Sequence, residues 1–181
     1  GSAYPVAPDY VVTNAHVVAG TNDTRVMQDE RGIDLEATVV SFDEKVDVAV
    51  LHVPGLNATV PQQAGAQRGT AAFVIGYPGG GSEMVSPAAV DGKTMARFND
   101  IYNEGEVTRQ IWVFNGTVRS GNSGGPLVDS AGRVLGIVFA ASAQAGSTQA
   151  YALTDQQIQG DVDQGIASRA PINTGGMACA V

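Results

Sequence analysis

Apolar and polar residues alternate over short stretches along most of the chain, which is the pattern of half-buried β-strands. Glycine, proline, asparagine and aspartate separate these stretches, as expected of strands joined by tight turns. Pro5 and Pro8 lack the N–H group that a strand ladder needs, so they should lie at a sheet edge or in a turn. The pattern predicts strands within 1–13, at 24–28, 35–42, 47–53, 70–76, 84–95, 110–114, 126–129, 134–141 and 149–153, with a turn at Arg31-Gly32 and a mobile loop over 99–106.

One helix is expected near the C-terminus. Thr154 can act as its N-cap, and Gln157 stands at the third helical position, which is the spacing of a capping box. The helix should run from Asp155 to about Ser168. The stretch at 55–69 is rich in glycine, glutamine and alanine and has the composition of a linker. The expected organisation is a β unit over 1–54, a linker over 55–69, a second β unit over 70–153, and a helix and tail over 154–181.

Composition narrows the classes of protein that fit. Hydrophobic residues make up 44% of the chain and charged residues only 15%, which favours a packed core over disorder. A net charge of -8 argues against a nucleic-acid surface, because phosphate binding needs a basic stripe. No stretch approaches the roughly 20 apolar residues that span a bilayer, and no signal peptide is recognisable. We therefore expect the 181 residues to be soluble.

The segment Gly121-Asn122-Ser123-Gly124-Gly125-Pro126-Leu127 places a hydroxyl between glycines, directly before a predicted strand. Glycines allow backbone conformations and close approaches that a Cβ atom would block. The N–H groups of Gly121 and Ser123 could then converge on one point and stabilise an oxyanion. Taken alone, the segment is better interpreted as an ordinary glycine-rich turn, because short motifs often occur by chance. Ser123 becomes a candidate nucleophile only with a base beside it.

The chain has two histidines, so the candidates for that base are few. His16 follows the apolar run that ends at Thr13, which leaves its ring at the end of a strand. His52 lies within an alternating run and is better interpreted as a surface or edge-strand residue. Asp47 directly precedes a buried strand, where a carboxylate needs a partner, whereas Asp43 lies in a charged turn. The sequence favours His16 as base and Asp47 as the carboxylate that orients it.

These three motifs, in the order His16, Asp47, Ser123, resemble those of the chymotrypsin-like and trypsin-like serine proteases. The resemblance implies an all-β fold of two six-stranded antiparallel β-barrels with a C-terminal helix. By this resemblance we expect the first barrel to be truncated, with the chain starting after its first strand. The same resemblance implies peptide-bond hydrolysis without metal or cofactor, on a protein or peptide substrate. We expect a monomer, and self-cleavage stays open.

The resemblance also assigns a substrate pocket. Phe139, Ala140 and Ala141 should form the strand that pairs with the backbone of a bound peptide. Thr117 should lie at the base of the primary side-chain pocket, with Gln149 and Tyr151 on its far wall. No carboxylate occupies that base, so we expect an uncharged side chain there rather than lysine or arginine.

The tail and the segment 76–81 are similar to those of actinobacterial membrane-anchored periplasmic proteases of the MarP type. This resemblance implies a location outside the cytoplasm, a membrane segment beyond these residues, and a disulfide partner for Cys179, the single cysteine. By analogy it implies a role in envelope stress or acid tolerance. HtrA-type proteases, which also carry asparagine at position 122, are the second choice.

Three other interpretations fit parts of the sequence. The glycine run at 79–81 could suggest a phosphate-binding loop. That loop needs a lysine after the glycines and a helix that begins there; the sequence has no such lysine, and we expect no helix at this point. Gly121-x-Ser123-x-Gly125 matches the nucleophile elbow of an α/β-hydrolase esterase. In that fold the catalytic histidine follows the serine in the chain, whereas His16 precedes Ser123, so the order of the residues argues against it. A binding or sensing module that keeps the protease fold without catalysis remains the alternative function.

Overall fold

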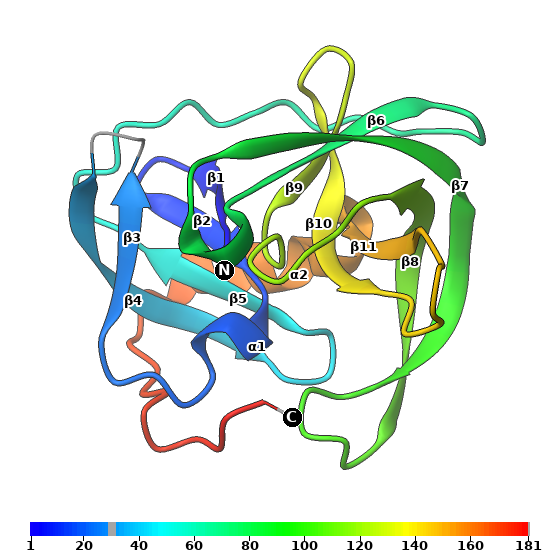
Figure 1. The fold of residues 1–181 in the computed structure, drawn as a ribbon. Coiled ribbons are helices and arrows are strands. Elements are labelled where there is room, and N and C mark those ends of the chain that lie inside the picture. The colour runs from blue at the N-terminus through cyan, green and yellow to red at the C-terminus, as the bar shows by residue number, and fades with distance from the viewer. Residues whose placement is uncertain (29–31, 181) are drawn as a thin grey trace.

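The computed structural model describes residues 1–28 and 32–180, which form an open antiparallel sheet beside a closed antiparallel barrel (Figure 1). Arg31 of the expected turn at Arg31-Gly32 therefore lies outside the described residues, as does Val181 at the end of the tail. The N-terminal end of the chain lies between the two β units, and helix α2 packs behind them (Figure 1). The site is built where these units meet.

The first unit is a sheet with the strand order β1-β2-β5-β4-β3, all neighbours antiparallel. Its central strands β2 and β5 are almost fully buried, since both faces of this sheet are covered. Val12 pairs with Val50, and the ladder ends with Thr13 opposite Ala49. The strands are β1 (Tyr4–Ala7), β2 (Tyr10–Thr13), β3 (Thr24–Gln28), β4 (Ile33–Asp43) and β5 (Val48–His52).

The second unit is a closed barrel with the order β10-β11-β8-β7-β6-β9. Its interior holds the apolar side chains of alternate positions, among them Val74, Phe114, Leu127 and Leu135. The strands are β6 (Ala71–Gly76), β7 (Met84–Asn99), β8 (Glu106–Gly116), β9 (Pro126–Asp129), β10 (Val134–Ala141) and β11 (Gln149–Thr154).

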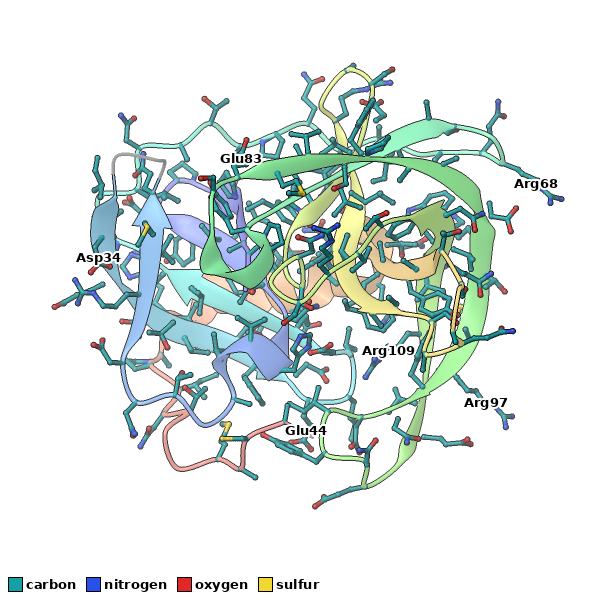
Figure 2. All side chains as sticks on the ribbon, viewed as in Figure 1. Asp34, Glu44, Arg68, Glu83, Arg97 and Arg109 are labelled. Atoms are coloured by element: carbon teal, nitrogen blue, oxygen red, sulfur yellow. The ribbon has the colours of Figure 1, made fainter. Side chains whose placement is uncertain are left out.

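Six strands are therefore present in the second unit, as expected, whereas the described residues of the first unit supply five strands in an open sheet. The predicted strands are all present, but β7 and β8 are longer than predicted. They form a ribbon that continues to the pair Asn99 and Glu106. The ribbon is stabilised near its tip by Phe98, which contacts Phe139 edge-on at a centroid distance of 5.0 Å. Charged side chains such as Arg97 point outward (Figure 2).

Two short helical turns and one longer helix complete the fold of the residues that the structure describes. α1 (Ala15–Val18) follows β2 at once, and a 3-10 turn, η1 (Pro78–Gly80), occupies the glycine run where no helix was expected. α2 (Asp155–Ser168) begins where predicted, and Gln157 N–H donates to Thr154 Oγ1 at 3.2 Å. Among the described residues, no helix has the length and apolarity needed to cross a membrane.

Asp155, at the start of α2, couples stability to pH. Burial raises the pKa of its carboxyl to about 7, and its Oδ1 is buried without a hydrogen-bond partner in the described chain. The folded chain therefore holds a proton that the unfolded chain loses near pH 4. Burial also raises the pKa of Asp161, on the same helix, to about 6.

We expect the contribution of Asp155 to the free energy of unfolding to be largest below about pH 4, its pKa in the unfolded chain, and to be lost as pH rises to about 7, its pKa in the folded chain. Asp155→Asn should flatten this fall, because the amide carries no charge to bury. Urea unfolding at a series of pH values measures the slope. Asp163→Asn, which removes an exposed carboxylate from the same helix, is the control. A slope that Asp155→Asn leaves unchanged would contradict the assignment.

Candidate functional site

His16 and Asp47 meet in a short hydrogen-bonded pair. His16 lies in α1 directly after β2, and Asp47 lies directly before β5, so the pairing of these two strands brings them together. His16 Nδ1 lies 2.8 Å from Asp47 Oδ2, and the His16 backbone N–H donates to Asp47 Oδ1 at 3.0 Å. The Asp47 side chain is 5% exposed and that of His16 is 29% exposed. A buried carboxylate thus holds one nitrogen of a ring that is open to solvent.

The backbone around Asp47 is held in an unusual conformation. Asp47 has φ 70°, in the left-handed region that residues other than glycine rarely adopt. Its carbonyl accepts a hydrogen bond from Asn14 Nδ2 at 2.9 Å, and its N–H donates to Asp43 O at 2.9 Å. Asp43 Oδ1 accepts the N–H groups of Lys45 and Val46. Asp43, the alternative carboxylate, therefore shapes the turn, while Asp47 faces the histidine.

Ser123 lies in the tight turn that precedes β9. Gly121 and Gly124 have φ values of 102° and 86°, so both use backbone conformations that a side chain would strain. A Cβ atom on Gly124 would overlap Thr13 Oγ1 and the carbonyl of Ser2. The turn therefore packs directly against the end of β2, the strand that leads to His16.

The N–H groups of Gly121 and Ser123 have no acceptor within residues 1–28 and 32–180. Their neighbours in the turn are bonded, since Asn122 N–H donates to Arg119 O at 3.0 Å and Gly124 N–H to Val138 O at 2.9 Å. Two unpaired donors in a tight turn can receive an external oxygen atom.

Ser123 and His16 are not hydrogen-bonded to each other in the described part of the chain. Bonds between nucleophile and base are often long before substrate binds and tighten in the complex. His52, the other histidine, lies at the end of β5 and packs its ring against Tyr10 at a centroid distance of 4.9 Å. Among the residues that the structure describes, no group of three or more His, Cys, Asp or Glu side chains could hold a metal ion.

A trypsin-like peptidase domain model matches residues 1–137, and so includes the three motifs. The chain belongs to the trypsin-like peptidase family. It is 40% identical to the serine protease Rv3671c of Mycobacterium tuberculosis, over 97% of this chain and 44% of that protein. It is 32% identical to a probable periplasmic DegP-like serine endoprotease of Pseudomonas savastanoi, over 76% of this chain and 28% of that protein. The chain thus spans less than half the length of these relatives.

The fold of this trypsin-like domain also matches solved structures. The active form of the Rv3671c protease superposes with a TM-score of 0.93 at 38% identity, covering all of this chain and 78% of that one. The inactive form gives a TM-score of 0.80, at 40% identity over 91% of this chain and 82% of that one. The expected chymotrypsin-like fold and the resemblance to MarP-type proteases, with HtrA-type relatives second, are confirmed.

The residues expected to line a peptide pocket lie on β10, β11 and the segment after β8. Thr117 is exposed, and Tyr151 Oη donates to Gln149 Oε1 at 2.9 Å. Ala140 and Ala141 become progressively more exposed toward the end of β10, where their backbone can meet a ligand. The Phe139 side chain is only 6% exposed, so its ring belongs to the core.

Arg109 is a buried charged residue that interacts with Asp47 and that the sequence did not predict. It is 3% exposed on β8 and shares the face of Ile111, which is opposite to the face that carries Trp112 and Phe114. Its Nε donates to Lys45 O at 2.8 Å and its Nη2 to Asn99 O at 3.1 Å. It thus reaches from the barrel to the β4–β5 turn, on which Glu44 also lies (Figure 2).

The charge of Arg109 is buried among carboxylates. Burial lowers the pKa of its guanidinium, and the negative charges of Asp47, Asp43 and Asp100 oppose that shift. The guanidinium carbon also lies 5.3 Å from the centroid of the Phe139 ring. The positive charge of Arg109 therefore interacts electrostatically with Asp47, the carboxylate that holds His16. Its place two residues before Ile111, on the same face of the strand, is the signal that could have identified it.

Gly121→Ala should distort the turn that holds Ser123 and lower the rate of peptide cleavage. An added Cβ would overlap Tyr77 O and lie 2.8 Å from Gly79 N, and both are backbone atoms that cannot move alone. Because the Gly121 N–H must turn away, we expect kcat for peptide cleavage to fall about 10²-fold or more. Gly132→Ala is the matched control, since it also has positive φ, at 76°, but has open space around it. It should lower stability by about 1 kcal/mol and leave kcat unchanged.

Proposed function

We propose that this chain is a serine endopeptidase with Ser123 as nucleophile, His16 as general base and Asp47 as the residue that orients His16. The observation that carries the proposal is the contact of 2.8 Å between His16 Nδ1 and a buried Asp47 carboxylate, in a member of the trypsin-like peptidase family. Family membership gives the reaction class, and this contact supplies the tautomer that the reaction needs. With Nδ1 donating to Asp47, the other ring nitrogen is free to accept a proton.

In the first half of the reaction, Ser123 Oγ forms a bond to the carbonyl carbon of the scissile peptide. The hydroxyl proton passes to His16 Nε2, and the imidazolium so formed is stabilised by the Asp47 carboxylate. Negative charge develops on the former carbonyl oxygen. The unpaired N–H groups of Gly121 and Ser123 are the donors that would bind that oxyanion.

Collapse of this tetrahedral intermediate breaks the C–N bond. His16 Nε2 returns its proton to the leaving amine, which departs with a new N–H bond, and the acyl group stays on Ser123 Oγ. A water molecule then gives a proton to His16 Nε2 as its oxygen attacks the ester carbon. The proton returns to Ser123 Oγ as the acid product leaves, so the enzyme is regenerated.

We further propose that the primary pocket takes an uncharged side chain. Thr117 is the residue proposed for its base, and Gln149 and Tyr151, joined by their hydrogen bond, for its wall. None of these three side chains carries a counter-ion for lysine or arginine. The edge of β10 at Ala140 and Ala141 is proposed to pair with the peptide backbone.

A diverse peptide library, digested in parallel by the chain and by its Ser123→Ala variant, tests this function. The proposal predicts cleavage by the parent alone, after uncharged residues. Cleavage mainly after lysine or arginine would contradict the pocket but not the chemistry. Cleavage by neither protein would instead support a binding or sensing module with a protease fold.

The site of action is proposed to lie outside the cytoplasm. A DegP-like relative is named as a probable periplasmic protease, and the MarP-type resemblance points the same way. A membrane anchor, and a disulfide formed by the exposed Cys179, are further parts of this proposal. Since Cys179 is the single cysteine, its partner would come from outside these 181 residues. A role in envelope stress or acid resistance would follow from that location.

A further inference from the structure

Ser2 makes a hydrogen bond with each of its polar atoms, although it lies 119 residues from the turn that it contacts. It is 6% exposed. Its Oγ donates to Gly121 O at 2.7 Å, and its backbone N–H donates to Ser123 O at 2.8 Å. Ser2 therefore holds the carbonyl groups of the two residues whose N–H groups are the unpaired donors.

The other two bonds of Ser2 lead away from the turn. Its Oγ accepts the backbone N–H of Tyr77 at 3.0 Å, at the end of β6. Its carbonyl accepts the hydroxyl of Thr13 at 2.7 Å, at the end of β2. Ser2 thus joins the nucleophile turn to the strand that leads directly to His16, across the junction of sheet and barrel.

The planarity of the peptide group explains why these bonds matter. In a trans peptide the C=O and N–H groups point in opposite directions, so fixing one fixes the other. Ser120 O accepts Gly79 N–H at 2.9 Å, and Asn122 O accepts Gly125 N–H at 2.9 Å, which sets the directions of the Gly121 and Ser123 N–H groups. The peptide between them is fixed on its carbonyl side by Ser2 Oγ.

We propose that Ser2 is a positioning residue that orients the Gly121–Ser123 turn relative to His16. This inference rests on the proposed function. Without the Ser2 hydroxyl, the bonds from Ser2 Oγ to the Gly121 carbonyl and from the Tyr77 N–H to Ser2 Oγ are both lost. A rotation of the central peptide to recover hydrogen bonds would move both donor groups away from the developing oxyanion. The substrate strand at 139–141 makes no bond to Ser2, so ground-state binding should persist.

The test is the kinetics of Ser2→Ala, with active sites counted by titration with a fluorophosphonate. We expect kcat per titrated site to fall about 10- to 100-fold. KM should stay within about twofold, because the lost interaction acts mainly in the transition state. A peptide boronic acid, which mimics the tetrahedral intermediate, should bind more weakly by a factor similar to the loss in kcat.

Ser41→Ala is the matched control, because Ser41 is 3% exposed in β4 and lies on the α2 side of that strand, where a Cβ atom added at Gly165 would come within 3.1 Å of Ser41 Cβ. It should lower stability at most and leave kcat unchanged. If Ser2 served only the stability of the fold, Ser2→Ala would likewise lower stability and leave kcat unchanged. An unchanged kcat in Ser2→Ala would therefore overturn the proposal. If Ser2→Ala does not fold, Thr13→Val decides by the same criterion, since it removes the bond from β2 to Ser2. A parent chain without activity would instead count against the proposed function.

Discussion

Ser123→Ala should lower kcat for peptide cleavage by about 10⁶-fold, the largest loss that we expect from any single substitution. Alanine has no atom that can form the acyl-enzyme, so the remaining hydrolysis must use water directly. The N–H groups of Gly121 and Ser123 survive the change, and a residual rate above that of the uncatalysed reaction should therefore remain. Cleavage of a fluorogenic peptide, followed over days at high enzyme concentration, measures both rates.

The same experiment should include His16→Ala and the double variant. Because hydroxyl and imidazole act in one proton transfer, each single change should cost about as much as both together. Ser130→Ala removes an exposed hydroxyl from the β9–β10 turn and should leave kcat unchanged. Losses that simply multiply in the double variant would mean that Ser123 and His16 act independently, which the proposed mechanism does not allow.

Asp47→Asn should lower kcat by about 10⁴-fold while leaving the fold intact. The amide oxygen can still accept the His16 backbone N–H, which lies 3.0 Å from Asp47 Oδ1. The amide cannot stabilise an imidazolium, and its NH₂ group can donate to Nδ1. Such a bond would place the ring proton on Nε2, the nitrogen that must accept the proton of Ser123. Steady-state kinetics with circular dichroism separates this loss from unfolding.

Asp43→Asn is the comparison for that variant. Asp43 caps the turn by accepting the N–H groups of Lys45 and Val46, and an amide oxygen can keep at least part of this role. We expect a modest loss of stability and a kcat within about tenfold of the parent. A loss as large as that of Asp47→Asn would transfer the orienting role to Asp43.

Local signals in the sequence were sufficient for most of the strands. β9 and β10 begin and end where predicted, since each is a strongly apolar run bounded by turn residues. Thr154 likewise predicted the start of α2. The far ends of β7 and β8 were not predicted, because their polar residues alternate only weakly. Contacts of Phe98 with Phe139 on β10 stabilise that part of the ribbon, and such contacts leave no local signal.

Some residues of the candidate site could also be predicted from local signals, and others could not. His16, Asp47 and Ser123 could be proposed because each stands in a short motif with its own chemical reason. Ser2 could not, because its partners Tyr77 and Gly121 lie 75 and 119 residues away, and nothing around Gly1-Ser2 indicates burial. The positive φ of Asp47 could not be predicted from the sequence either, since it depends on the hydrogen bonds that Asp47 makes with Asn14 and Asp43.

The most direct measurement of the central claim is the reaction of the chain with a fluorophosphonate, followed by peptide mapping. If Ser123 is activated by His16, one equivalent of reagent should attach to Ser123 and to none of the other serines. The labelling rate should fall sharply in His16→Ala and in Asp47→Asn. A label that spreads over several serines, or that forms on Ser123 equally fast without His16, would contradict the account.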